Sequence, residues 1–250
     1  RWWWRRLAEQ LQVMTGIDDA RRLDATTGSA GSAVIDGISG TSKLTVASGA
    51  TFNLVTNTIG GTLTLPGISG TVLQLDGGSR LGVEVGPNTG TNAGSTAGAS
   101  TGSSIRLNTG AKALVTGLVT VDAYFLPGIV THSGLSDILV APGGGLTTSN
   151  GSSGSYAVGN LYNVTNFTVT GIVPSDTLVQ FNVSAATALS QVFWKGAYSG
   201  PTNVWAVSNG STLSNWTTDL AGTVNTGLVP SASTDVVIAA SGQANQDNMV

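Results

Sequence analysis

Short apolar runs alternate with polar, glycine-containing turns along most of the chain. Between Thr26 and about Asp122, stretches such as LTVASGATFNLV place apolar residues at alternate positions, so that Leu44 and Val46 share one face. Clusters of Gly, Asn, Asp and Ser separate these runs. The pattern predicts short β-strands joined by turns over roughly nine tenths of the chain.

The recurrence of one strand followed by one turn predicts an all-β fold, built as a right-handed parallel β-helix. In such a solenoid, successive rungs stack in parallel and bury a continuous aliphatic interior. Short strands with turn signals between them also permit an antiparallel sandwich or barrel. Periodicity alone separates these architectures poorly, but hairpin dipeptides are not repeated throughout, and this favours the solenoid.

Residues 1–25 differ in kind from the rest of the chain. They carry five of the ten basic residues and three of the six Trp. Trp4, Leu7, Leu11 and Met14 recur at helical spacing, which predicts a short N-terminal helix. Such a helix can cap the open end of a solenoid or mark a fragment boundary, and a Trp/Arg-rich amphipathic helix can also lie in a membrane interface.

Two polar segments interrupt the strand pattern of residues 26–190. Residues 87–104 contain no large apolar side chain, and residues 143–155 are rich in Gly, Ser and Thr. Both are therefore predicted to be surface loops of one elongated solenoid body.

Composition narrows the range of functions. Only 9% of residues are charged, the net charge is -3 and 40% are hydrophobic, so the chain can bury enough apolar surface to fold. Cys is absent, which excludes disulfides and thiolate metal sites. No apolar run reaches the length of about 18 residues that a membrane-spanning helix needs. We expect the sequence to be a fragment whose export and anchoring segments lie outside it.

No arrangement of chemically active residues stands out, and the sequence predicts neither catalysis nor a cofactor nor a metal site. The single His, His132, has Ser133 and Asp137 nearby, but this proximity in sequence does not make a catalytic triad. Scattered acids supply no metal-ligand spacing. Beyond residue 24 there are only five basic residues, so nucleic-acid binding is not expected.

The isolated acids are interpreted as turn caps, because they stand mostly beside Gly, Ser or Thr. They are Asp36, Asp76, Glu84, Asp122, Asp137, Asp176, Asp219 and Asp235. Acids paired on one face of the solenoid would instead indicate an enzyme that acts on polysaccharides, and this alternative stays open.

Residues 191–250, here called the Trp module, contain three Trp within 23 residues. The characteristic positions are Trp194, Gly196, Trp205, Asn215, Trp216, Pro230 and Asp235. In this segment the chain resembles autotransporter-type β-helical passengers, the exported bacterial proteins that carry autotransporter-associated β-strand repeats. The resemblance implies that the module continues the solenoid.

The same residues also have a physical interpretation. Three Trp side chains are unfavourable on the surface, so we expect them to pack together or against the coil, although aromatic rings can also stack on sugars. Pro230 is expected to fix the preceding loop, and Asp235 to begin a rung through an Asx turn.

The resemblance implies a structural or adhesive passenger protein at the bacterial cell surface or in the extracellular space. Passengers of this family are exported through an outer-membrane barrel, which would lie outside this sequence. Expected partners are molecules of a host or neighbouring cell surface, or the protein itself. A polysaccharide-binding or polysaccharide-degrading β-helix is the alternative.

Overall fold

The computed structural model describes residues 22–25, 33–34, 44–54, 61–65, 69–86, 102–126, 134–200, 204–238 and 244. All regular elements in these ranges are β-strands, and none of the ranges contains a helix long and apolar enough to cross a membrane. The helix predicted from Trp4 to Met14 lies outside the described residues. Residues 22–25, which the sequence grouped with that helix, form the strand β1 (Arg22–Ala25).

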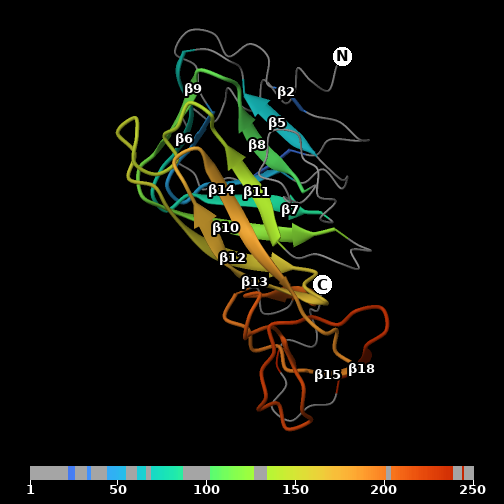
Figure 1. The fold of residues 1–250 in the computed structure, drawn as a ribbon. Coiled ribbons are helices and arrows are strands. Elements are labelled where there is room, and N and C mark those ends of the chain that lie inside the picture. Colours follow the sequence, from blue (N-terminus) through green and yellow to red (C-terminus); the bar gives the residue numbers. More distant parts are fainter. Residues whose placement is uncertain are drawn as a thin grey trace, which may run out of the picture.

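The described strands form a parallel β-solenoid of about four turns, which confirms the predicted fold class (Figure 1). Sheet A consists, in order, of β1, β4 (Thr51–Leu54), β7 (Arg80–Val85), β10 (Leu118–Phe125), β12 (Ser155–Tyr162) and β16 (Val207–Ser208). Sheet B consists of β2 (Ala33–Val34), β5 (Thr62–Leu65), β8 (Ser104–Leu107), β11 (Gly134–Val140), β14 (Leu178–Ala185) and β13 (Phe167–Pro174). Sheet C consists of β3 (Leu44–Val46), β6 (Gly70–Leu75) and β9 (Ala111–Val115).

The register of sheet A gives the length of each turn. Thr51 pairs with Arg80, and Arg80 pairs with Thr120, so one turn spans 80 − 51 = 29 residues and the next spans 120 − 80 = 40 residues. The longer turn contains the polar segment predicted at residues 87–104. The last residues of this polar segment already belong to the solenoid, because Ser103 is buried and Ser104 begins β8.

A recurring four-residue β-turn forms corners of the solenoid. Gly49, Gly78 and Gly110 each have a positive φ, of 76°, 85° and 89°, which favours glycine. In each turn, the residue after the glycine donates its backbone N–H to the carbonyl oxygen three residues earlier, at 2.9–3.1 Å. Consecutive corners also bond to each other, since the N–H of Gly49 donates to the carbonyl oxygen of Gly78 at 3.1 Å.

Alternate strand residues fill one continuous core. On β7, for example, Leu81, Val83 and Val85 are fully buried and belong to the same apolar cluster as Phe52 and Leu54 on β4. Full burial of such a side chain contributes roughly 1.5–3 kcal/mol. The core therefore runs from turn to turn, as the alternating pattern predicted.

Antiparallel strands and a loop cover the C-terminal end of the solenoid. In sheet B, β14 pairs antiparallel with β11, and β13 pairs antiparallel with β14. In sheet A, β16 pairs antiparallel with the last two residues of β12. Residues 141–154, which include most of the polar segment predicted at 143–155, form a loop that bonds to β9.

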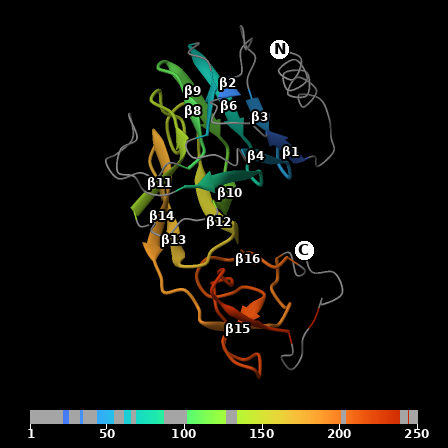
Figure 2. The same ribbon diagram turned by 90° about the vertical axis from the view of Figure 1, so that its right-hand side faces the viewer.

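The Trp module has a sheet of its own. Sheet D has the order β17 (Trp216–Thr217), β15 (Gln191–Trp194), β18 (Asp235–Val237), and its core contains Val192 and Val229. The sequence predicted a continuation of the solenoid, but the described residues of the module add only β16 to the solenoid sheets. Antiparallel strands already occupy positions where the next parallel rung would pair, so the module lies beyond the last strands (Figures 1 and 2).

Candidate functional site

The three Trp side chains of the module pack against one another. Trp216 makes edge-to-face contacts with Trp194 and with Trp205, at centroid distances of 5.0 and 4.5 Å. Trp194 and Trp216 are fully buried, and Trp205 is partly buried. The indole N–H of Trp216 donates to the carbonyl oxygen of Trp205 at 2.8 Å. Two of the three rings therefore present no surface on which a sugar could stack.

Asn215 and Gly196 hold the backbone around this cluster. Asn215 is fully buried, accepts the N–H of Tyr198 at Oδ1 (2.9 Å) and donates from Nδ2 to the carbonyl oxygen of Val204 (2.9 Å). Gly196 has a φ of 66°, and a Cβ there would lie 2.0 Å from the carbonyl oxygen of Ala244. Asn215 therefore holds two backbone segments by hydrogen bonds, and Gly196 is required because a side chain there would overlap the backbone of Ala244.

The hydrogen bonds around Pro230 and Asp235 involve segments other than the three Trp residues. Pro230 follows Val229, whose N–H donates to the carbonyl oxygen of Val164 in the solenoid at 2.8 Å. Asp235 begins β18 but is exposed, and its backbone N–H donates to the carbonyl oxygen of Ser190. The turn before β18 is held instead by Thr234, whose hydroxyl accepts the N–H of Ser231 at 2.9 Å.

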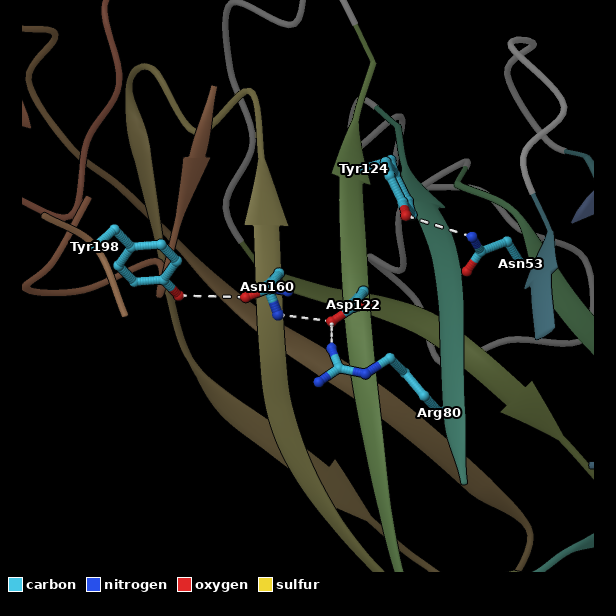
Figure 3. Close-up of polar contacts among 6 residues, drawn as sticks. All are labelled: Asn53, Arg80, Asp122, Tyr124, Asn160 and Tyr198. Carbon is cyan, nitrogen blue, oxygen red and sulfur yellow. Dashed lines mark hydrogen bonds and ion pairs between the residues drawn. The ribbon is translucent and has the colours of Figure 1, made fainter. Parts of the chain in front are cut away.

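A network that the sequence did not predict lies on the outer face of sheet A (Figure 3). Arg80 on β7 forms an ion pair with Asp122 on β10. The same carboxylate accepts the backbone N–H of Asn160 on β12 at 2.6 Å. The Asn160 side-chain oxygen accepts the hydroxyl of Tyr198 at 3.4 Å. The network thereby connects three solenoid turns with the Trp module.

The interpretation of isolated acids as turn caps is wrong for Glu84, Asp122 and Asp137. All three lie within strands and are buried. Glu84 and Asp122 occupy outward-facing positions of sheet A, because their neighbours along the strand point into the core. The sequence signal that identifies them is their position in the apolar alternation, rather than the residues beside them.

Burial dominates the electrostatics of this face. It raises the pKa of Asp122 above its usual range, and the ion pair with Arg80 and the hydrogen bond from Asn160 offset only part of that effect. Burial, together with Tyr124 and Asp122, also raises the pKa of Tyr162 to about 12. Tyr162 therefore stays neutral at physiological pH.

Two glycines make room for the outer-face side chains. Tyr124 and Tyr162 stack with their centroids 4.6 Å apart, and Tyr124 accepts a 3.4 Å hydrogen bond from Asn53. A Cβ at Gly82 would lie 2.1 Å from Asn53 Oδ1, and a Cβ at Gly159 would lie 2.2 Å from Asp122 Oδ1. A larger residue at either position would displace these polar groups.

Sheet B carries a second cross-turn ion pair. Arg106 on β8 bonds to the buried Asp137 on β11 at 2.9 Å. Gln180 on β14 donates to the other oxygen of the same carboxylate at 2.8 Å. Asp137 is thus held by side chains from two strands. Its neighbours in sequence, His132 and Ser133, lie outside the described residues.

Asp176 and Asp219 do cap turns, as the sequence predicted. Asp176 lies in the turn between β13 and β14 and accepts backbone N–H groups from Gly145, Thr147, Thr148 and Ser149 in the loop that covers β9. Slight burial raises its pKa, but the hydrogen bonds from Ser149 and its neighbours outweigh this and hold the pKa well below its usual value.

Nothing in the described ranges forms a group of three or more His, Asp or Glu that could hold a metal ion. Asp36 lies outside those ranges. Comparisons with protein-family models, with curated proteins and with solved structures found no match. The functional argument therefore rests on the geometry of this chain.

Proposed function

We propose that this chain is a segment of a secreted or cell-surface structural or adhesive passenger protein, in which the solenoid serves as a rod. The observation that carries the proposal is the use of charged side chains to join consecutive turns. Arg80 and Asp122 join β7 to β10, and Arg106 and Asp137 join β8 to β11. These contacts run along the stacking direction, where a rod must resist separation of its turns.

The composition supports an exposed, weakly charged rod. The net charge is only -3, so electrostatic repulsion between neighbouring rods is small and opposes their association only weakly. The proposed partners are therefore surface molecules of a host or neighbouring cell, or further copies of this protein. The proposed location is extracellular or at the bacterial outer surface, with anchoring through a segment beyond this sequence.

Surface labelling of intact cells tests this proposal. Antibodies raised against the purified chain are applied to cells that produce the full-length protein, before and after permeabilisation. The proposal expects labelling without permeabilisation, and slower settling of cells from which the gene has been deleted. Labelling that requires permeabilisation would rule out the surface location, and unchanged settling together with unchanged attachment would argue against adhesion.

A polysaccharide-binding or polysaccharide-degrading function is the second proposal. It rests on one observation, the position of Glu84 and Asp122 on the same outer face of sheet A, near Arg80 and the stacked tyrosines. Both carboxyl groups are almost completely buried, so catalysis would require the side chains that cover them to move away. Two carboxyl groups on one face are the minimal equipment for acid–base attack on a glycosidic bond. Incubation with a panel of plant and bacterial polysaccharides, using Glu84→Gln as the control, tests it. Product formation that the variant abolishes would support the enzyme over the passenger.

A further inference from the structure

The tetrapeptide Ser-Asn-Gly-Ser occurs twice in the chain, and the structure places the two copies in different surroundings. One copy is residues 149–152, in the loop of residues 141–154 that covers β9, and the other is residues 208–211, in the Trp module. The Asn-Gly peptide is the reactive part of each copy, because glycine has no side chain to hinder its backbone nitrogen. A difference in reactivity between the two copies therefore reports on the fold.

Asn-Gly peptides can lose ammonia without an enzyme. The glycine nitrogen gives up its proton and attacks Cγ of the asparagine, so that a new C–N bond forms while the bond from Cγ to Nδ2 breaks. Nδ2 takes up protons from water and leaves as ammonia, and the chain is left with a succinimide ring. Water then adds to one of the two ring carbonyls and opens the ring to aspartate or isoaspartate. The reaction needs only water, a glycine nitrogen that can approach Cγ and room for the turn to rearrange.

The copy in the loop over β9 meets these needs. Asn150 and Gly151 are both exposed, and they are the central residues of a turn in which the N–H of Ser152 donates to the carbonyl oxygen of Ser149 at 3.0 Å. The N–H of Gly151 has no acceptor among the described residues. No atom lies within 4 Å of the position that a Cβ on Gly151 would take. The turn therefore has room to change its backbone angles, and water can reach it.

The copy in the Trp module is enclosed. Gly210 is buried, and its N–H donates to the hydroxyl oxygen of Ser208 at 2.9 Å. A Cβ on Gly210 would lie 2.0 Å from Cδ1 of Leu161. The side-chain oxygen of Asn209 accepts the backbone N–H groups of residues 211–213 at 2.9–3.1 Å. Attack on Asn209 therefore requires several hydrogen bonds to break and a buried segment to open.

The loop around Asn150 satisfies the free edge of β9, the last strand of sheet C. The N–H of Ala113 donates to the carbonyl oxygen of Gly144 at 3.0 Å. The N–H of Val115 donates to the hydroxyl oxygen of Ser152 at 2.9 Å, and its carbonyl oxygen accepts the N–H of Ser153 at 2.8 Å. The fourth group of these two residues is the carbonyl oxygen of Ala113.

Asn150 supplies the donor for that fourth group. Its Nδ2 donates to the carbonyl oxygen of Ala113 at 2.8 Å and to the hydroxyl oxygen of Thr71 on β6 at 2.9 Å. Deamidation replaces this donor with a carboxylate oxygen, which accepts hydrogen bonds but cannot donate them. Two acceptors then face each other at the edge of β9, and the carbonyl group of Ala113 loses its partner, which is costly. The modification therefore removes the side-chain contact that joins Asn150 to β9.

We propose that Asn150 is a site of spontaneous deamidation, and that the modified residue releases the loop of residues 141–154 from β9. The change accumulates with the age of each molecule, because the reaction needs no enzyme. Asn209 has the same neighbours in sequence and is preserved by the fold. Release exposes the edge groups of Ala113 and Val115, and such unpaired groups can bind another strand.

Peptide mapping by mass spectrometry tests the first part of the proposal. The purified 250-residue chain is kept in mildly alkaline buffer for several weeks, and conversion of amide to acid is followed at both sites. In the folded chain, Asn150 is expected to convert at least about tenfold faster than Asn209. In concentrated urea, the two sites should convert at similar rates. Equal rates in the folded chain, or faster conversion of Asn209, would overturn the proposal. A difference in urea as large as that in the folded chain would also overturn it.

The variant Asn150→Asp tests the second part, because it places one product of deamidation directly in the chain. By NMR-detected hydrogen exchange, the amides of Ala113 and Val115 are expected to exchange at least about tenfold faster than in the unmodified chain. Asn209→Asp is the matched control, since it retains the oxygen that accepts from residues 211–213, and it should leave both amides unchanged. Unchanged exchange in Asn150→Asp, or equal acceleration in the two variants, would contradict release of the loop.

Discussion

Arg80 and Asp122 form an ion pair between consecutive turns of the solenoid, with Asp122 almost completely buried and Arg80 partly exposed. Burial of the carboxylate has a cost that the guanidinium only partly offsets, since the pKa of Asp122 is raised. The two partners are therefore unequal: removal of Arg80 leaves a buried carboxylate without its counter-charge, whereas removal of the carboxylate charge leaves Arg80 in contact with solvent.

Arg80→Met is expected to destabilise the chain by about 1–3 kcal/mol at neutral pH, and Asp122→Asn by less. Because the folded-state pKa of Asp122 is raised, the folded state binds its proton more tightly than the unfolded state does. Protonation of Asp122 removes the buried charge that Arg80 balances. The destabilisation caused by Arg80→Met should therefore shrink as the pH falls through the pKa of Asp122. Urea unfolding across a pH series measures this, and a cost that grows with acid would contradict it.

Asp176→Asn is expected to loosen the loop over β9. The folded-state pKa of Asp176 is lowered, so its contribution is fully present above its unfolded value of about 3.9 and is lost as the pH falls toward the folded-state pKa. Since the side chain remains in contact with solvent, screening limits its contribution to stability to about 1 kcal/mol. Amide exchange of Thr148 and Ser149 should accelerate in the variant. Asp219→Asn, at the other capped turn, is the control and should leave these two amides unchanged.

Gly82→Ala is expected to destabilise the chain by about 1–3 kcal/mol, because the new Cβ would overlap the Asn53 side chain. A second substitution, Asn53→Ala, removes the overlapping atoms. The double variant should therefore lose less than the sum of the two single losses, and a double-mutant cycle by thermal or urea unfolding measures the difference. Strictly additive losses would show that Gly82 is not needed for this close approach.

Trp216→Ala is expected to cost about 3–5 kcal/mol and to disrupt the Trp module, because the ring is fully buried between two other indoles. Leu220→Ala, in the same module but 58% exposed, should change stability by less than about 0.5 kcal/mol. Trp fluorescence during denaturation reports on both variants. Equal effects of the two would contradict the packing described for the cluster.

The sequence predicted the strands of the solenoid well because its core is built from alternate residues, as in the run from Leu44 to Leu54. The glycine turns at Gly49, Gly78 and Gly110 carry a further signal, a glycine followed by Ala or Ser between two alternating runs, and they recur at corners of the coil. The polar segment at residues 87–104 interrupts the recurrence of this signal, so the spacing between corners is irregular.

The polar networks could not be predicted in the same way. Arg80 and Asp122 are 42 residues apart, and their contact depends on a register that the variable turn lengths obscure. The separate sheet of the Trp module was missed for a related reason: the antiparallel closures by β14 and β16 depend on pairings between distant segments. Apolar alternation indicates which face of a strand is buried but not which strand lies beside it.

Spin-label distances between consecutive turns test the central claim most directly. The chain has no Cys, so labels can be attached to introduced cysteines at Thr45, Gln74 and Leu114, the outward-facing register partners on β3, β6 and β9. Parallel stacking predicts that the pair at Thr45 and Gln74 lies one strand spacing apart, about 4.8 Å between backbones, and the pair at Thr45 and Leu114 two spacings apart. Strong dipolar broadening for the first pair and weaker broadening for the second would agree with the solenoid. A long distance for Thr45 and Gln74, as an antiparallel sandwich allows, would contradict it.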